Sequence, residues 1–179
     1  EKYGNAGKTE LMAVTKTVPP EVVNWVFGEG IYLLGENRVQ EYLGKRESYD
    51  LKEHSGILPQ VHFIGGLQTN KVKYIIDDID MIQSVDSLKL AQEINRLAIA
   101  HNKVMDVLCE VNIGGEDSKG GIPPADAVSF IEQLAPMEGI TTYTYRNTHA
   151  EVFGKCDRYF APFIVPTDNE RISRKTLRD

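Results

Sequence analysis

Short apolar runs of β type alternate with amphipathic helical segments from Leu11 to about Ile140, and this alternation constrains the fold most strongly. Runs that are apolar almost throughout are typical of strands buried on both faces, as in parallel sheets covered by crossover helices. The sequence therefore predicts consecutive βα units. The segments with a strand pattern are 11–15, 31–34, 61–64, 81–85 and 105–113.

Between these runs, apolar residues recur at helical spacing and form one stripe on each segment. Pro19-Pro20 and Pro123-Pro124 stand where helices should begin, Gly28 and Gly30 where the first helix should end, and Asp86 is the expected N-cap of the fourth. Such units close into a barrel or form an open doubly wound sheet, and the pattern alone does not choose between them. The predicted helical segments are 22–27, 39–43, 72–79, 90–98 and 128–135.

The composition narrows the possible partners and location. A length of 179 residues, 41% of them hydrophobic, favours one domain with one core. A net charge of −6 argues against a general affinity for nucleic acid or anionic membranes. With only two cysteines, no signal-peptide profile at the start and no membrane-spanning apolar run, we expect a cytoplasmic protein. The histidines have no ligand spacing, so no metal site is predicted.

The alternation of strand and helix patterns fails after Ile140. We therefore divide the chain into a barrel region, 1–140, and an atypical tail, 141–179, which is either irregular or the remnant of the last barrel units. The tail begins with a strand-like run at 141–146 but leads into no clear helical stripe. A solvated or disordered end is the alternative interpretation.

Lys16 stands immediately after the first predicted strand. In parallel βα architectures the reactive side chains gather at the carboxyl ends of strands, where the following loops surround a shared mouth. A lysine there can be partly desolvated, which frees its amine to attack an aldehyde and form a Schiff base. The alternative is a solvent-exposed loop lysine, as most lysines are.

Polar residues also follow the other strands. Asn37 offers a donor and an acceptor to a planar polar ligand, or else it caps a helix over 38–45. Segment 62–71 opens from a glycine pair into a helix whose N-terminus would favour an anion, unless it is a short turn capped by Thr69. Ser84 ends the fourth strand, and Lys119 is a second amine in a glycine-rich loop that is either a mobile lid or a simple connection. That loop lacks the order and spacing of a phosphate-binding loop.

Taken in order, segments 13–17, 35–41, 62–71, 83–86 and 111–121 resemble the pyridoxal phosphate (PLP) homeostasis family, whose members look like the barrel domain of alanine racemase standing alone. The resemblance implies a modified TIM-type (β/α) barrel in which Lys16 holds PLP as a Schiff base and Asn37 lines the cofactor pocket. We add Ser84 and Lys119 as candidate cofactor contacts.

The resemblance also implies a role in vitamin B6 balance and in supplying PLP to PLP-dependent apoenzymes. We expect a monomer or weak dimer without robust turnover, because racemisation on such a barrel needs an opposing acid/base group from a second domain. A PLP-dependent racemase or lyase with a partner domain is the first alternative. A barrel fragment that acts only through protein contacts is the second.

The chain departs from the family pattern at two places. Gly66 stands where many relatives carry histidine in the Ile-Gly-His-Leu-Gln motif. The Ser-Met-Gly-Met and Arg-x-Gly segments that hold the phosphate in the family are absent, so we expect the barrel to be incomplete or altered at its C-terminal end. Loss of those contacts would weaken PLP binding, because each charge-assisted hydrogen bond is worth about 1.5–3 kcal/mol.

Overall fold

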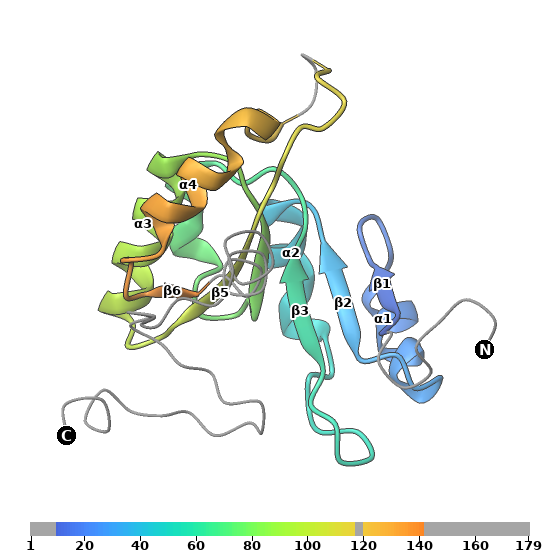
Figure 1. The fold of residues 1–179 in the computed structure, drawn as a ribbon. Helices are drawn as coiled ribbons and strands as arrows, with labels where there is room; N and C mark the ends of the chain where they lie inside the picture. The colour runs from blue at the N-terminus through green and yellow to red at the C-terminus, as the bar shows by residue number, and fades with distance from the viewer. Residues whose placement is uncertain (1–9, 117–119, 142–179) are drawn as a thin grey trace.

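The computed structural model describes residues 10–116 and 120–141, and its central feature is one six-stranded parallel sheet (Figure 1). Every strand pairs with the next one in the sequence. A doubly wound sheet reverses its strand order at a switch point, whereas a barrel wall does not. The order therefore confirms the predicted (β/α) barrel topology. The strands are β1 Met12–Val14, β2 Leu33–Glu36, β3 Gln60–Phe63, β4 Met81–Val85, β5 Met105–Cys109 and β6 Ile140–Thr141.

The helices follow the strands in alternation and cover the outer face of the sheet, where α3 and α4 pack side by side (Figure 1). Leu34, Phe63 and Ile82 are fully buried and share the face of the sheet on which Glu36 contacts the helical layer through Lys45. The core therefore lies between the sheet and the helices. The helices are α1 Pro20–Gly28, α2 Val39–Lys45, η1 Arg46–Ser48, η2 Thr69–Tyr74, α3 Leu88–Ala100, η3 Pro124–Asp126 and α4 Ala127–Leu134.

The opposite face of the sheet is the inner face of the barrel wall. Val14 pairs with Gly35, and paired residues of neighbouring strands share a face. A Cβ placed on Gly35 would lie 2.8 Å from the sulfur of Met12 and 2.9 Å from Cδ1 of Ile64, so these residues lie on the same face. Glycine at position 35 allows this close approach. The inner face is less covered than the outer one, and Val14 is exposed.

The predicted strand 81–85 matches β4, and the predictions 11–15 and 61–64 are off by one residue at each end, whereas the other two predicted strands differ by more. β2 covers Leu33–Glu36 rather than 31–34, because the carboxylate of Glu36 finds hydrogen-bond partners and can therefore be buried. β5 ends at Cys109 rather than at residue 113, and beyond it Val111 forms only an isolated bridge with Ile122. Polar and glycine-rich neighbours end the ladder there.

The predicted helices lie where the sequence placed them. One of them is of a different helix type than predicted, and another has a different N-cap residue. Segment 72–79 forms the 3₁₀ helix η2 and the turns after it rather than an α-helix, since the paired isoleucines and the following aspartates favour the α-helix poorly. Its apolar stripe is nevertheless fully buried. Ser87, and not Asp86, is the N-cap of α3. Pro20 begins α1 as predicted, and Gly30 follows its end at a φ of 80°. None of the helices in the described ranges could cross a membrane.

Candidate functional site

Lys16 lies in a turn at the carboxyl end of β1. The amide of Thr15 still donates to the carbonyl of Gly35 at 3.0 Å, so the strand alternation runs through residue 15. Thr15 is buried and donates to Glu36, and from this alternation we expect the next residue, Lys16, to start from the inner face with Val14. The side chain of Lys16 is exposed, so the partial desolvation predicted for its amine is not found. The exposed-loop alternative describes its environment better.

The backbone on both sides of Lys16 is hydrogen-bonded to side chains of α2. The Nζ atom of Lys45 donates to the carbonyl of Thr15 at 2.9 Å. On the other side of Lys16, the amide of Thr17 donates to the carboxylate of Glu41. Thr17 has a φ of 61°, a left-handed conformation that is rare for a β-branched residue. Lys16 is therefore flanked by two residues whose main chains are fixed by one helix.

A buried carboxylate lies beneath this turn. Glu36 is 0% exposed and accepts hydrogen bonds from the hydroxyl of Thr15 at 2.7 Å and from that of Tyr49 at 2.5 Å. Lys45 lies 3.1 Å from the same carboxylate and 2.9 Å from Glu41. The charge of Glu36 is thus compensated by one cation and two hydroxyl donors, which is what burial of a carboxylate requires.

The charges of this cluster shift the pKa values of its members. Burial, followed by the hydrogen bond to Glu36, raises the pKa of Tyr49 to about 12. Burial alone would lower the pKa of Lys45, but its hydrogen bonds to Glu41 and Glu36 outweigh that effect and the pKa is raised. The hydrogen bond from Lys45, followed by that from the Thr17 amide, lowers the pKa of Glu41. The cluster therefore favours a charged Lys45 and a charged Glu41.

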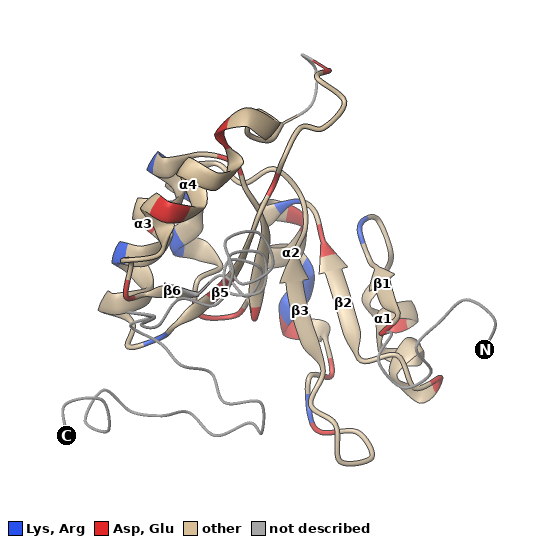
Figure 2. Ribbon diagram, viewed as in Figure 1, with Lys and Arg blue, Asp and Glu red and all other residues tan. Residues whose placement is uncertain are grey.

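Sequence reasoning did not single out Glu36, Glu41, Lys45 or Tyr49. Glu41 and Lys45 stand four residues apart on one helix, a spacing typical of ion pairs, so that pair could have been found. Figure 2 shows how the charged residues are distributed here: a basic residue in the loop after β1, an acidic residue at the end of β2, and both basic and acidic residues along α2.

Asn37 directly follows β2, and Ser84 is the last residue but one of β4, which is separated from β2 by β3 in the same sheet. The Oδ1 atom of Asn37 and the Oγ atom of Ser84 are buried and have no hydrogen-bond partner in the structure. Asn37 does not cap α2, because Arg38 is the N-cap residue, so that alternative is wrong. Buried polar atoms without partners are rare in folded proteins and call for an explanation.

Two local features position Asn37 and Ser84. A Cβ placed on Gly65 would lie 2.2 Å from the carbonyl oxygen of Asn37, so only glycine lets the loop after β3 pass this close. Ser84 lies within the register shift between Ile82 and Val85, where β4 departs from regular pairing with β5. Lys119, the fourth predicted cofactor contact, lies outside the described residues.

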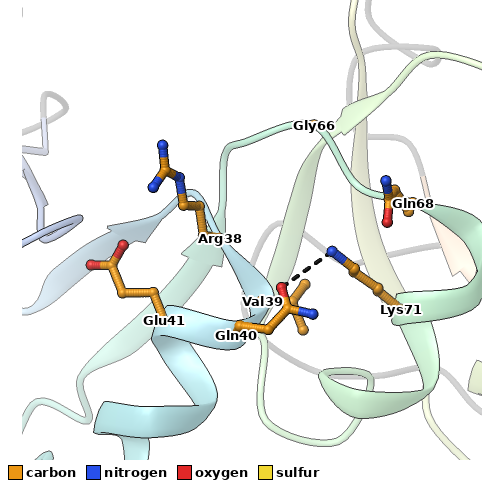
Figure 3. Close-up of a pocket in the computed structure, with 7 residues that line it drawn as sticks. All are labelled: Arg38, Val39, Gln40, Glu41, Gly66, Gln68 and Lys71. Atoms are coloured by element: carbon orange, nitrogen blue, oxygen red, sulfur yellow. Dashed lines mark hydrogen bonds between the residues drawn. The ribbon is translucent and has the colours of Figure 1, made fainter.

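A cavity of about 570 Å³ lies between the start of α2 and η2 (Figure 3). Lys71 donates to the side chain of Gln40 at 3.1 Å across it. Lys16, Asn37 and Ser84 do not line this cavity. The N-cap of η2 is Gln68 and not Thr69, which corrects the alternative of a Thr69 cap. The cavity is lined by Arg38, Val39, Gln40, Glu41, Gly66, Gln68 and Lys71.

No group of three His, Cys, Asp or Glu side chains that could hold a metal ion occurs within residues 10–116 and 120–141. Burial raises the pKa of the Cys109 thiol to about 11, which keeps it in the less reactive protonated form. Within these ranges, Cys109 is therefore not poised to act as a nucleophile.

Residues 2–158 match the family model of the alanine racemase N-terminal domain. Together with the sequential parallel strands, this match defines the class of protein as a barrel of the alanine racemase N-terminal type. The pyridoxal phosphate homeostasis protein of Aquifex aeolicus is 46% identical over 73% of this chain and 55% of its own length. That of Haemophilus influenzae is 32% identical over 99% of this chain and 69% of its own. The chain belongs to the family of pyridoxal phosphate homeostasis proteins.

A solved structure extends the comparison. PipY of Synechococcus elongatus, with PLP bound, is 29% identical and superposes with a TM-score of 0.65 over 74% of this chain and 60% of PipY. The chain spans about half the length of most curated relatives it matches.

Proposed function

We propose that this chain binds PLP, with Lys16 as the amine that holds the cofactor, and that it serves vitamin B6 homeostasis. The observation that carries the proposal is the pair of buried polar atoms without partners, Asn37 Oδ1 and Ser84 Oγ. Both lie at the sheet edge from which Lys16 emerges. A polar ligand at this edge would satisfy them.

The residues present fit PLP. Ser84 can donate and accept a hydrogen bond, and Asn37 can accept one at Oδ1. When bound, PLP supplies an aldehyde carbon that a lysine amine can attack, with formation of a C=N bond and release of water. For this, Lys16 must lose one proton to solvent and keep its amine directed to the inner face. The strand-end position of Lys16 serves the second requirement.

The relatives support the same proposal. PipY has been solved with PLP bound, and the curated relatives carry the name of PLP homeostasis proteins. We extend this role to the present chain as a holder of PLP that passes it to PLP-dependent apoenzymes, as a monomer or weak dimer in the cytoplasm. Strong catalytic turnover is not part of the proposal.

The test is a direct search for the covalent adduct. Addition of PLP should give the visible absorbance of a Schiff base, and borohydride reduction followed by peptide mapping should find the label on Lys16. Lys16→Ala should abolish both signals, whereas Lys52→Ala, a change at another exposed lysine, should leave them unchanged. Labelling at other lysines with no effect of Lys16→Ala would contradict the proposal. Loss of α-deuterium from amino acids would instead point to a racemase or lyase.

A further inference from the structure

The main chain on both sides of Lys16 is bound to one ion pair on α2. Lys45 donates to the carbonyl of Thr15 at 2.9 Å, and Glu41 accepts from the amide of Thr17. Lys45 and Glu41 are themselves joined at 2.9 Å. These contacts bridge 30 and 24 residues of sequence, so they tie the turn to a separate element rather than to its own strand.

The turn needs such support. Thr17 has a φ of 61°, and its hydroxyl donates to the carbonyl of Lys16 at 2.6 Å. A β-branched residue in the left-handed region persists only where its surroundings impose that conformation. The carboxylate of Glu41 is the group that holds the Thr17 amide in this orientation.

The ion pair is in turn anchored below the surface. The side chain of Lys45 is 12% exposed and lies 3.1 Å from Glu36, which is 0% exposed. Glu36 also receives the hydroxyls of Thr15 and Tyr49. Because these partners lie in the sheet and in the core, α2 cannot shift relative to the turn without breaking buried polar contacts.

We propose that Glu41 and Lys45 are positioning residues for Lys16, which fix the backbone on both sides of it and thereby direct its amine to the inner face. This inference rests on the proposed function. A lysine amine sits on a flexible four-carbon stem, so the position of its backbone sets the region that the amine can reach. Without the two contacts the amine would spend less time in a geometry from which it can attack a bound aldehyde.

The experiment compares Glu41→Ala and Lys45→Met with the matched surface controls Glu53→Ala and Lys52→Met. Alanine is compatible with α2, so Glu41→Ala removes the acceptor without opposing the helix. The first measurement needs no cofactor and follows hydrogen exchange at the Thr17 amide. The second follows the rate and extent of PLP capture at Lys16 by borohydride reduction and mapping, together with the pH dependence of the adduct absorbance.

Glu41→Ala should increase Thr17 exchange and reduce PLP capture at Lys16 by about tenfold each, as expected for loss of one charge-assisted hydrogen bond. Glu41→Gln, which retains an acceptor oxygen, should restore most of both, and Lys45→Arg should do the same for Lys45→Met. The controls should match wild type. If Lys45→Met does not fold, Glu41→Ala decides the matter alone, because Glu41 is only partly buried.

The outcomes separate the two proposals. If the wild-type chain and Glu41→Ala capture PLP at Lys16 equally well, the positioning role is overturned and the proposed function stands. Unchanged Thr17 exchange in Glu41→Ala would overturn it as well. A wild-type chain that captures no PLP at Lys16 would overturn both.

Discussion

The hydroxyl of Thr15 donates a 2.7 Å hydrogen bond to the buried carboxylate of Glu36 and so joins β1 to β2 at the point where the candidate lysine emerges. The same carboxylate receives Tyr49 and Lys45. One acidic residue therefore binds donors from the residue after β1, from α2 and from the segment after η1. Stability and function should both depend on it.

Glu36→Ala should lower the free energy of unfolding by about 3 kcal/mol, because it leaves a largely buried lysine and two hydroxyls without their acceptor. Urea denaturation followed by circular dichroism measures this. Glu53→Ala, a surface change, should stay within about 0.5 kcal/mol of wild type. An equally small effect of Glu36→Ala would show that the cluster contributes little to folding.

Ser84→Ala should separate stability from binding. Since Ser84 Oγ is buried without a partner, its removal should leave the stability of the cofactor-free chain unchanged or raise it by about 1 kcal/mol. PLP affinity should fall by about tenfold, the worth of one hydrogen bond to the ligand. Thermal unfolding with and without PLP measures both quantities. A loss of stability without PLP, at unchanged affinity, would assign Ser84 a purely structural role.

Gly65→Ala should destabilise the chain by about 1–3 kcal/mol, because its Cβ would lie 2.2 Å from the carbonyl oxygen of Asn37 and force the backbone to move. The displacement should also weaken PLP binding through Asn37. Gly66→Ala is the matched control, since nothing lies within 4 Å of its Cβ position. Gly66→His, the residue common in the resembling family, should be tolerated for the same reason. Equal effects at positions 65 and 66 would contradict this account.

Stability should fall as the pH rises from 10 to 12. Burial and the hydrogen bond to Glu36 raise the pKa of Tyr49 from 10.0 to about 12, so the folded chain keeps a proton that the unfolded chain loses in this range. The stabilisation is complete below pH 10 and is lost as the pH rises through 12. Burial also raises the pKa of Tyr42, which extends the effect to higher pH. Urea midpoints measured across this range should decline less steeply in Tyr49→Phe, and an equal slope in both chains would exclude Tyr49 as the source.

The sequence predicted the strands and helices because apolar spacing reports directly on burial. The apolar stripe of α3 is buried as its spacing indicated, whereas in α1 only Val23 and Phe27 are buried and Val22 is exposed. The predicted position of β2 is wrong by two residues, because a glutamate such as Glu36 is typical of a loop when its hydrogen-bond partners are unknown. Those partners lie in other elements, and no local pattern reveals them.

The candidate site was predicted only in part for the same reason. Lys16, Asn37 and Ser84 could be named because parallel strands end at one shared edge. Glu41 acts on Thr17, which is 24 residues away, and Lys45 acts on Thr15, which is 30 residues away. Such contacts depend on the angle at which α2 packs, and single-sequence periodicity does not contain that angle. The choice between barrel and open sheet had the same limit, since strand order is a property of pairing.

The strictly sequential strand order also bears on how the chain forms. Each strand after β1 pairs with the strand synthesised just before it, as Leu33 with Met12 and Gln60 with Leu33, so no pairing closes a loop longer than one βα unit. A growing polypeptide can add one unit at a time to a ready-made edge as it leaves the ribosome. Among the strands that the structure describes, none of the pairings has to wait for a distant piece of sequence.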